Sequence, residues 1–156
     1  MAVTTGQTAP SFTLQDTEKN RRSLTDFQGQ NVVLLFFPLA FTSVCTAELC
    51  GVRDNLKNYE QLNAQPLGIS VDSMFTLGKF KEDQNLNFPL LSDFNKEASA
   101  AYGALYEDFF GMKGVSKRAA FVVDKEGIVQ YAEVLENAGE QPNFEAIQGK
   151  LRELNA

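Results

Sequence analysis

The chain has 156 residues, 44% of them hydrophobic and 13 of them Phe, a composition that suits one domain spanning residues 1–156 with a buried core. Its net charge of -6 argues against the basic face that a nucleic-acid partner would require. The sequence contains no histidine, which excludes Ser-His-Asp and Cys-His catalysis and removes the commonest zinc or iron ligand.

The amino-terminal residues and the number of cysteines indicate the cellular compartment of the protein. Residues 1–10 lack the basic and apolar regions of a signal peptide, and the longest apolar stretch, residues 32–41, is too short to span a bilayer. Two cysteines are too few for the disulfide framework of a secreted domain. We therefore expect a cytoplasmic protein without a membrane partner, in which the close cysteine pair is catalytic or redox-sensing.

The first half of the chain predicts a hairpin followed by a strand-helix-strand unit. Short strands at Ser11–Leu14 and Arg22–Thr25 flank a polar turn. The continuously apolar run Asn31–Phe37 is typical of a strand that is buried on both faces. Apolar residues at helical spacing predict a helix over Thr46–Leu62, and Leu67–Val71 predicts the next, parallel strand.

The second half predicts two helices and an antiparallel hairpin. A helix is expected over Met74–Gln84, with Asp72 or Ser73 as its N-cap. A turn over residues 124–127 joins a strand at Ala119–Val123 to a second at Ile128–Val134. A final helix, over residues 143–154, is opened by Pro142. These elements predict an α/β fold with a mixed central sheet flanked by helices and an amino-terminal β-hairpin extension.

Cys45 is the residue with the clearest chemical potential. It follows a buried strand and a Pro-led loop, at the place where a helix is expected to begin. Unpaired backbone N–H groups and the positive end of the helix dipole favour a thiolate there, which matters in a chain without an imidazole base. Taken alone, the same cysteine is also compatible with inert core packing.

The segment Phe36-Phe-Pro-Leu-Ala-Phe-Thr-Ser-Val-Cys45 resembles the Pro-x-x-x-Thr/Ser-x-x-Cys signature of peroxiredoxins, thioredoxin-fold peroxidases that reduce hydroperoxides with a cysteine. Three other segments resemble this family in the same order along the chain: residues 6–14, 88–93 and 118–124. The resemblance implies a thioredoxin-like fold, a hydroperoxide substrate and no metal, flavin or haem cofactor.

The resemblance also implies roles for individual residues. Cys45 would be the peroxidatic nucleophile, with Thr42 and Arg118 contacting the sulfur and the peroxide oxygens. Pro38 would shape and shield the pocket. Glu48 would support the arginine, although a Glu in the first turn of a helix can also simply complement the helix dipole. Fixed donors around the sulfur would stabilise the charge that moves from sulfur to the departing oxygen.

The sequence resembles two peroxiredoxin subfamilies that differ in the role of a residue at the position of Cys50. The segment Cys45–Asp54 resembles the PrxQ class, also called bacterioferritin comigratory protein, in which a second cysteine at this spacing resolves the sulfenic acid. Residues 36–41 and 88–94 resemble the AhpE branch, whose members typically work with one cysteine. The two branches imply a monomer and a homodimer, respectively. The implied reductant is a thioredoxin or glutaredoxin system. If Cys50 takes no part in the reaction, an external thiol would attack the sulfenic acid, and Cys50 would be a small buried residue.

Helix geometry constrains any bond between Cys45 and Cys50. Five residues in an ideal α-helix separate the Cα atoms by roughly 8.6 Å, whereas a disulfide needs them within about 6.8 Å. Resolution by Cys50 therefore predicts that the segment from Cys45 to Gly51 unwinds on oxidation.

Two other functions stay open on the residues alone. A thioredoxin-like disulfide oxidoreductase usually has Cys-x-x-Cys, whereas this pair is Cys-x-x-x-x-Cys. A redox sensor or chaperone-like binding module would use the same oxidation as a switch without turnover.

Overall fold

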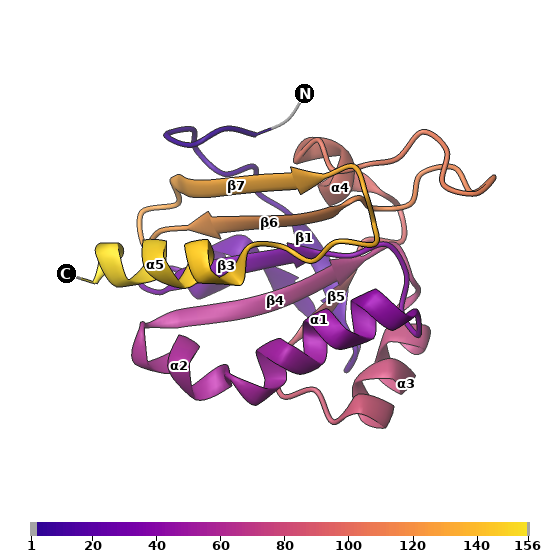
Figure 1. Ribbon diagram of the computed structural model, residues 1–156, viewed down its shortest axis with the longest axis horizontal. Helices are drawn as coiled ribbons and strands as arrows, with labels where there is room; N and C mark the ends of the chain where they lie inside the picture. The colour runs from indigo at the N-terminus through magenta and orange to yellow at the C-terminus, as the bar shows by residue number, and fades with distance from the viewer. Residues whose placement is uncertain (1–2, 156) are drawn as a thin grey trace.

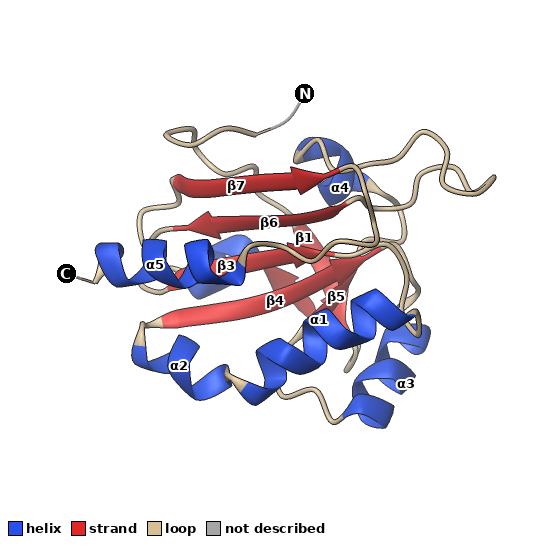
Figure 2. Cartoon of the chain, viewed as in Figure 1, coloured by secondary structure: helices blue, strands red, loops and turns tan. Residues whose placement is uncertain are grey.

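The computed structural model describes residues 3–155 and consists of a seven-stranded mixed sheet with helices on both faces (Figures 1 and 2). The strand order is β2-β1-β5-β4-β3-β6-β7. The strands are β1 (Thr13–Asp16), β2 (Arg21–Ser23), β3 (Asn31–Phe36), β4 (Ala64–Ser70), β5 (Leu90–Ser92), β6 (Arg118–Val123) and β7 (Val129–Leu135). The helices are the 3-10 helix η1 (Leu24–Phe27), α1 (Ser43–Asp54), α2 (Leu56–Gln61), α3 (Met74–Gln84), α4 (Glu97–Ala101) and α5 (Phe144–Leu154).

The centre of the sheet has the mixed pairing that the sequence predicts. Strand β4 lies between β3 and β5 and is parallel to both, while β6 is antiparallel to β3 and to β7. The amino-terminal hairpin β1-β2 is not separate from this sheet, because β1 also pairs antiparallel with β5. The α/β prediction is confirmed, and the hairpin forms one edge of the same sheet.

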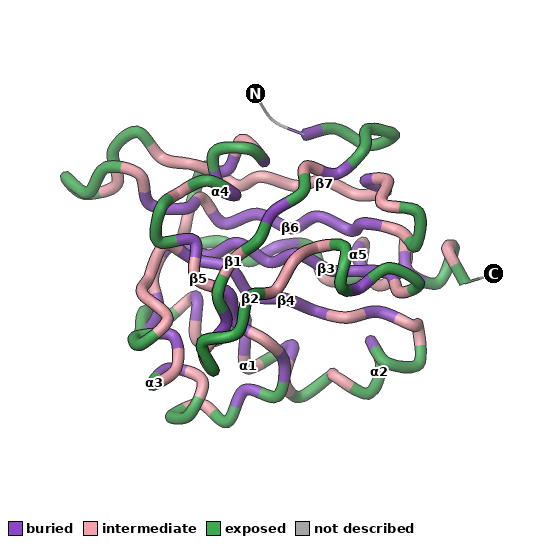
Figure 3. The backbone as a smooth tube through the Cα atoms, turned by 180° about the vertical axis from the view of Figure 1, so that it is seen from behind, coloured by how far each residue is buried: buried purple, intermediate pink, exposed green. Residues whose placement is uncertain are grey.

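Two apolar clusters, one on each face, account for the continuous apolar run of β3. Every residue of β3 is buried (Figure 3). Val33 and Leu35 pack into a cluster with residues of α1, α2, α3 and α5, while Val32 and Leu34 pack into the cluster that includes η1 and α4. A strand covered on both faces needs apolar residues at odd and even positions alike.

The predicted helix over residues 46–62 is wrong at its start and in its middle. Helix α1 begins three residues earlier, at Ser43, and ends at Asp54 before the short helix α2. The break is at Asn55, whose side-chain amide donates to the Gly51 carbonyl oxygen at 2.9 Å. An Asn side chain that bonds the backbone in this way competes with the helical pattern, which is why apolar spacing alone did not reveal the break.

Within residues 3–155, no helix is both long enough and apolar enough to cross a lipid bilayer.

Candidate active site

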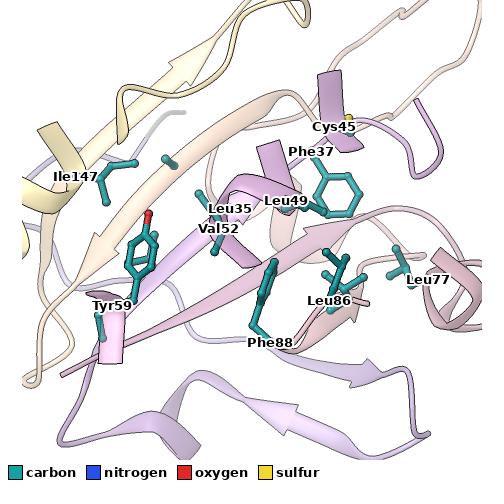
Figure 4. Packing of buried hydrophobic residues seen from close by; sticks show 14 of the residues in the cluster. Leu35, Phe37, Cys45, Leu49, Val52, Tyr59, Leu77, Leu86, Phe88 and Ile147 are labelled. Carbon is teal, nitrogen blue, oxygen red and sulfur yellow. The ribbon is translucent and has the colours of Figure 1, made fainter. Parts of the chain in front are cut away.

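Cys45 lies in the first turn of α1, which follows β3 after the loop of residues 37–42. Its side chain is fully buried, at one end of the apolar cluster that also contains Phe37 and Leu49 (Figure 4). Thr42 is the N-cap of α1, and its carbonyl oxygen accepts the first helical hydrogen bond, from the Thr46 N–H at 2.9 Å. The backbone N–H of Cys45 therefore precedes the helical ladder, at the positive end of the helix dipole.

Arg118 reaches this sulfur because of the sheet topology. Strands β3 and β6 are antiparallel, with Phe36 opposite Ala119, so the start of β6 lies beside the end of β3. Arg118 is the first residue of β6, and its Nη2 donates to Cys45 Sγ at 3.2 Å. A guanidinium at this distance stabilises negative charge that develops on the sulfur.

The guanidinium of Arg118 is held by two further partners. Nη1 donates to Glu48 Oε1 at 2.6 Å, while Nε and Nη2 donate to the carbonyl oxygen of Ala138 at 3.1 and 2.8 Å. Burial alone would lower the pKa of Arg118, but the charges of Glu48 and Cys45 outweigh it and raise that pKa above its ordinary value. Arg118 therefore presents a permanent, oriented positive charge to the sulfur.

Glu48 lies three residues beyond Cys45 on α1 and is fully buried. Burial raises the pKa of Glu48 to about 7, against the opposing effect of the Arg118 charge and with a smaller upward effect from Glu133. Among residues 3–155, its second carboxyl oxygen, Oε2, has no hydrogen-bond partner. The carboxyl group whose pKa burial raises thus lies directly beside the Arg118 guanidinium.

The loop before α1 is fixed by a hydrogen bond to its own backbone and by one to Asp72. The Thr42 hydroxyl donates to the Leu39 carbonyl oxygen at 2.7 Å, so its hydrogen is not directed at the sulfur and its lone pairs stay available to accept a hydrogen bond. Asp72, just beyond β4, accepts from the Ala40 N–H at 2.8 Å. Pro38 is buried in the same loop.

Cys50 lies on the same helix as Cys45 but has different neighbours. Both cysteines are free, and the helix between them is continuous. Cys50 is half-buried, and its Sγ contacts Gln84 Oε1 at 3.5 Å. The structure therefore brings together Cys45, Arg118 and Glu48, with Thr42 and Pro38 in the preceding loop, and places Cys50 in a separate contact with the end of α3.

Comparison with known proteins identifies the family. The AhpC/TSA family model matches residues 5–132. The chain is 41% identical over 132 residues to alkyl hydroperoxide reductase E of Mycobacterium tuberculosis, covering 83% of this chain and 84% of that protein. The chain belongs to the AhpC/TSA family of peroxiredoxins. Peroxiredoxins are thiol-dependent enzymes that act on peroxides and are recycled by thioredoxin-type reductants.

Further matches confirm the fold and the mixed subfamily character of this peroxiredoxin. It is 38% identical over 128 residues to peroxiredoxin Bcp of Escherichia coli K12, covering 81% of this chain and 82% of that protein. The crystal structure of peroxidoxin BcpB from M. tuberculosis matches with a TM-score of 0.87 at 31% identity, covering 97% of this chain and 98% of that one. The predicted thioredoxin-like fold is confirmed, and the chain resembles both Bcp-type and AhpE-type relatives.

Two site residues were not found from the sequence. Asp72 was considered as the N-cap of α3, but Ser73 fills that position, with its hydroxyl accepting from the Thr76 N–H at 3.1 Å. Asp72 instead anchors the Cys45 loop. The other residue is Ala138, which acts through its backbone carbonyl and so carries no side-chain signal. The position of Asp72 just after a strand at the carboxyl edge of the sheet was the one available indication.

Proposed function

We propose that this peroxiredoxin reduces hydrogen peroxide and organic hydroperoxides through a sulfenic acid at Cys45. The observation that carries the proposal is the 3.2 Å contact between Arg118 Nη2 and the buried Cys45 Sγ at the start of α1. A buried cation and a helix N-terminus together stabilise a thiolate without a histidine. The rival function of a Cys-x-x-Cys disulfide oxidoreductase fits neither the spacing nor the family.

In the first step the Cys45 thiolate attacks one peroxide oxygen. An S–O bond forms while the O–O bond breaks, and the hydroperoxide proton ends on the departing oxygen, which leaves as water or an alcohol. The sulfenate left on Cys45 takes up a proton from solvent and becomes the sulfenic acid. Arg118 stabilises the negative charge as it moves from the sulfur to that oxygen. The Thr42 hydroxyl, whose hydrogen is committed to Leu39, accepts from the hydroperoxide O–H and orients it. Pro38 shields this pocket, and Glu48 holds Arg118 in place.

In the second step Cys50 resolves the sulfenic acid. The Cys50 sulfur forms a disulfide with Cys45, and the sulfenic oxygen leaves as water. Thioredoxin or a glutaredoxin-type dithiol then reduces the disulfide by thiol exchange. The intact helix between the two cysteines favours one alternative, the one-cysteine cycle of AhpE-type enzymes, in which an external thiol attacks Cys45 directly. The cytoplasmic location expected from the sequence stays a prediction.

The test is peroxide consumption by the wild type and by Cys45→Ser, coupled to thioredoxin and its reductase. We expect Cys45→Ser to reduce turnover to the uncatalysed background, because a serine hydroxyl is not ionised at this site. Cys50→Ser should still consume one equivalent of peroxide. Catalytic turnover by Cys45→Ser would contradict the proposal, and a wild type that is oxidised once without recycling would favour the redox sensor.

A further inference from the structure

The half of α1 that contains Cys50 forms hydrogen bonds with the carboxyl end of α3 and the residues that follow it. Cys50 Sγ contacts Gln84 Oε1 at 3.5 Å, and Arg53 Nη1 donates to the Gln84 carbonyl oxygen at 2.5 Å. A third bond runs from Asn87 Nδ2 to the Arg53 carbonyl oxygen at 3.2 Å. These three contacts join one turn of α1 to residues 84–87, and they are separate from the contacts around Arg118.

The contact of Cys50 with Gln84 is a hydrogen bond from a thiol to an amide oxygen. An amide oxygen only accepts hydrogen bonds, and the Cys50 thiol donates to Gln84 Oε1 at 3.5 Å. A thiol is a poor nucleophile compared with a thiolate. Gln84 therefore holds the Cys50 thiol on the side of α1 that faces α3.

Geometry requires that this arrangement come apart before a disulfide forms. In the continuous helix the Cα atoms of Cys45 and Cys50 are roughly 8.6 Å apart, beyond the limit of about 6.8 Å for a disulfide. The segment between them must unwind, and Cys50 must leave Gln84. The Arg53 bond to Gln84 opposes both movements because it fixes the next turn of the same helix.

We propose that Gln84 and Arg53 are positioning residues for the resolving step, which hold Cys50 in α1 and slow its attack on the Cys45 sulfenic acid. The inference rests on the proposed function of Cys50. In this step an S–S bond forms and the S–O bond of Cys45 breaks. The hydroxyl leaves with the Cys50 proton as water, so the sulfenic sulfur is reduced, the Cys50 sulfur is oxidised, and no further reactant is needed.

The consequence is a competition between two reactions of the sulfenic acid. Slow release of Cys50 leaves time for a second hydroperoxide molecule to oxidise Cys45 to a sulfinic acid, with an alcohol or water as the other product. Weakening the contacts should therefore speed disulfide formation and protect Cys45 from overoxidation. Because the contacts lie away from Arg118, the first oxidation should keep its rate.

The test is Gln84→Ala, with Lys79→Ala as the matched control. Lys79 lies on the same helix and forms exposed ion pairs with Glu82 and Asp83 within α3. The reduced proteins are mixed with hydrogen peroxide, quenched with acid over a time course and analysed by intact mass. We expect Gln84→Ala to form the disulfide about threefold to tenfold faster than the wild type. This is the effect of losing one hydrogen bond that stabilises the helical form of α1.

Two further variants separate positioning from general destabilisation. Arg53→Ala should also speed disulfide formation, whereas Gln84→Glu keeps a side-chain oxygen that accepts from the thiol and should stay slow. All variants should form the sulfenic acid at the wild-type rate, and Gln84→Ala should give less sulfinic acid at high peroxide. A loss of structure around the site would instead slow the first oxidation.

The outcomes distinguish this inference from the proposed function. Equal disulfide rates in the wild type, Gln84→Ala and Arg53→Ala would overturn the positioning role and leave the resolving role of Cys50 intact. A disulfide in Gln84→Ala but not in the wild type would support the positioning role. No disulfide in any of the proteins, with the first equivalent of peroxide still consumed, would overturn resolution by Cys50 and the positioning role with it.

Discussion

At the scale of single residues, Arg118 shows how a charge can be buried usefully. Its side chain is almost inaccessible to solvent, yet three partners satisfy its donors: Cys45, Glu48 and the Ala138 carbonyl. A buried cation without such partners would be strongly destabilising. The same bonds that make burial tolerable also fix the direction of the guanidinium toward the sulfur.

We expect Arg118→Lys to slow the first oxidation step by about 10²-fold, the usual effect of losing a fixed donor to a developing charge. Lysine keeps the charge, but one ammonium cannot donate in the planar arrangement that reaches Cys45, Glu48 and Ala138 together. The measurement is the second-order rate constant of the reduced enzyme with hydrogen peroxide. Arg22→Lys is the control, because Arg22 pairs with Asp16 at the edge of the sheet. Equal rates for the wild type and Arg118→Lys would contradict the assigned role.

Glu48 should give this protein a distinctive dependence of stability on pH. The pKa of its carboxyl is raised by burial from an ordinary value of 4.5 to about 7. The folded chain therefore binds the proton more tightly than the unfolded chain does. The resulting stabilisation is complete below about pH 4.5 and is lost as the pH rises through about 7.

We expect the wild-type free energy of unfolding to lose about 3 kcal/mol more than that of Glu48→Gln between pH 4.5 and pH 7.5, taking about 1.4 kcal/mol for each pKa unit. The glutamine has the same shape and does not titrate. Urea unfolding at a series of pH values, in the presence of reductant, provides the measurement. Parallel pH profiles for the two proteins would show that Glu48 is ionised throughout this range.

At the scale of secondary-structure elements, the sequence predicted long and strongly patterned segments well. Strand β3 and helix α3 are close to the predicted ranges, because their apolar patterns extend over a whole strand or several helical turns. Strand β5, of three residues, and helix α4, of five, were not predicted, since neither is long enough to show a period. Short elements are fixed by their tertiary contacts.

In the candidate site, too, some features follow from a local sequence pattern and others depend on tertiary contacts. The approach of Arg118 to Cys45 was expected from a motif resemblance, and the antiparallel pairing of β3 with β6 explains it physically. The role of Asp72 depends on the order of strands in space. Strands β3 and β4 are parallel neighbours, so Asp72 ends beside Ala40 although 32 residues separate them. No local pattern contains that information.

We expect Asp72→Ala to destabilise the protein by about 1–3 kcal/mol, because the variant leaves the Ala40 N–H without its partner. The loop that carries Thr42 should become more mobile, which predicts slower oxidation of Cys45 as well. Urea unfolding and the rate with hydrogen peroxide measure the two effects. Asp83→Ala, on the exposed side of α3, is the control. Loss of stability with an unchanged oxidation rate would show that the loop is positioned by other contacts.

At the scale of the whole molecule, one sheet joins two separate apolar clusters. Tyr59 and Leu49 belong to the cluster beneath α1, α2, α3 and α5, while Tyr102 and Phe121 belong to the cluster on the opposite face. Both clusters use the side chains of β3, whose alternate residues point in opposite directions. If the sheet unfolds on one face, the β3 side chains of the other cluster lose their burial as well. We therefore expect residues 3–155 to unfold as one unit, and the single domain expected from the sequence stays a prediction.

We therefore expect probes on the two faces to report the same unfolding transition. Tyr59 and Tyr102 lie in different clusters, so fluorotyrosine labelling and fluorine NMR can follow each face separately during urea unfolding. Gly68→Ala provides a perturbation of one face, because a Cβ at Gly68 would lie 2.6 Å from Leu90 Cδ2 in the cluster of Tyr59. Overpacking of this kind costs about 1–3 kcal/mol. The midpoints of both resonances should fall together in Gly68→Ala, whereas a shift confined to Tyr59 would mean that the two faces unfold independently.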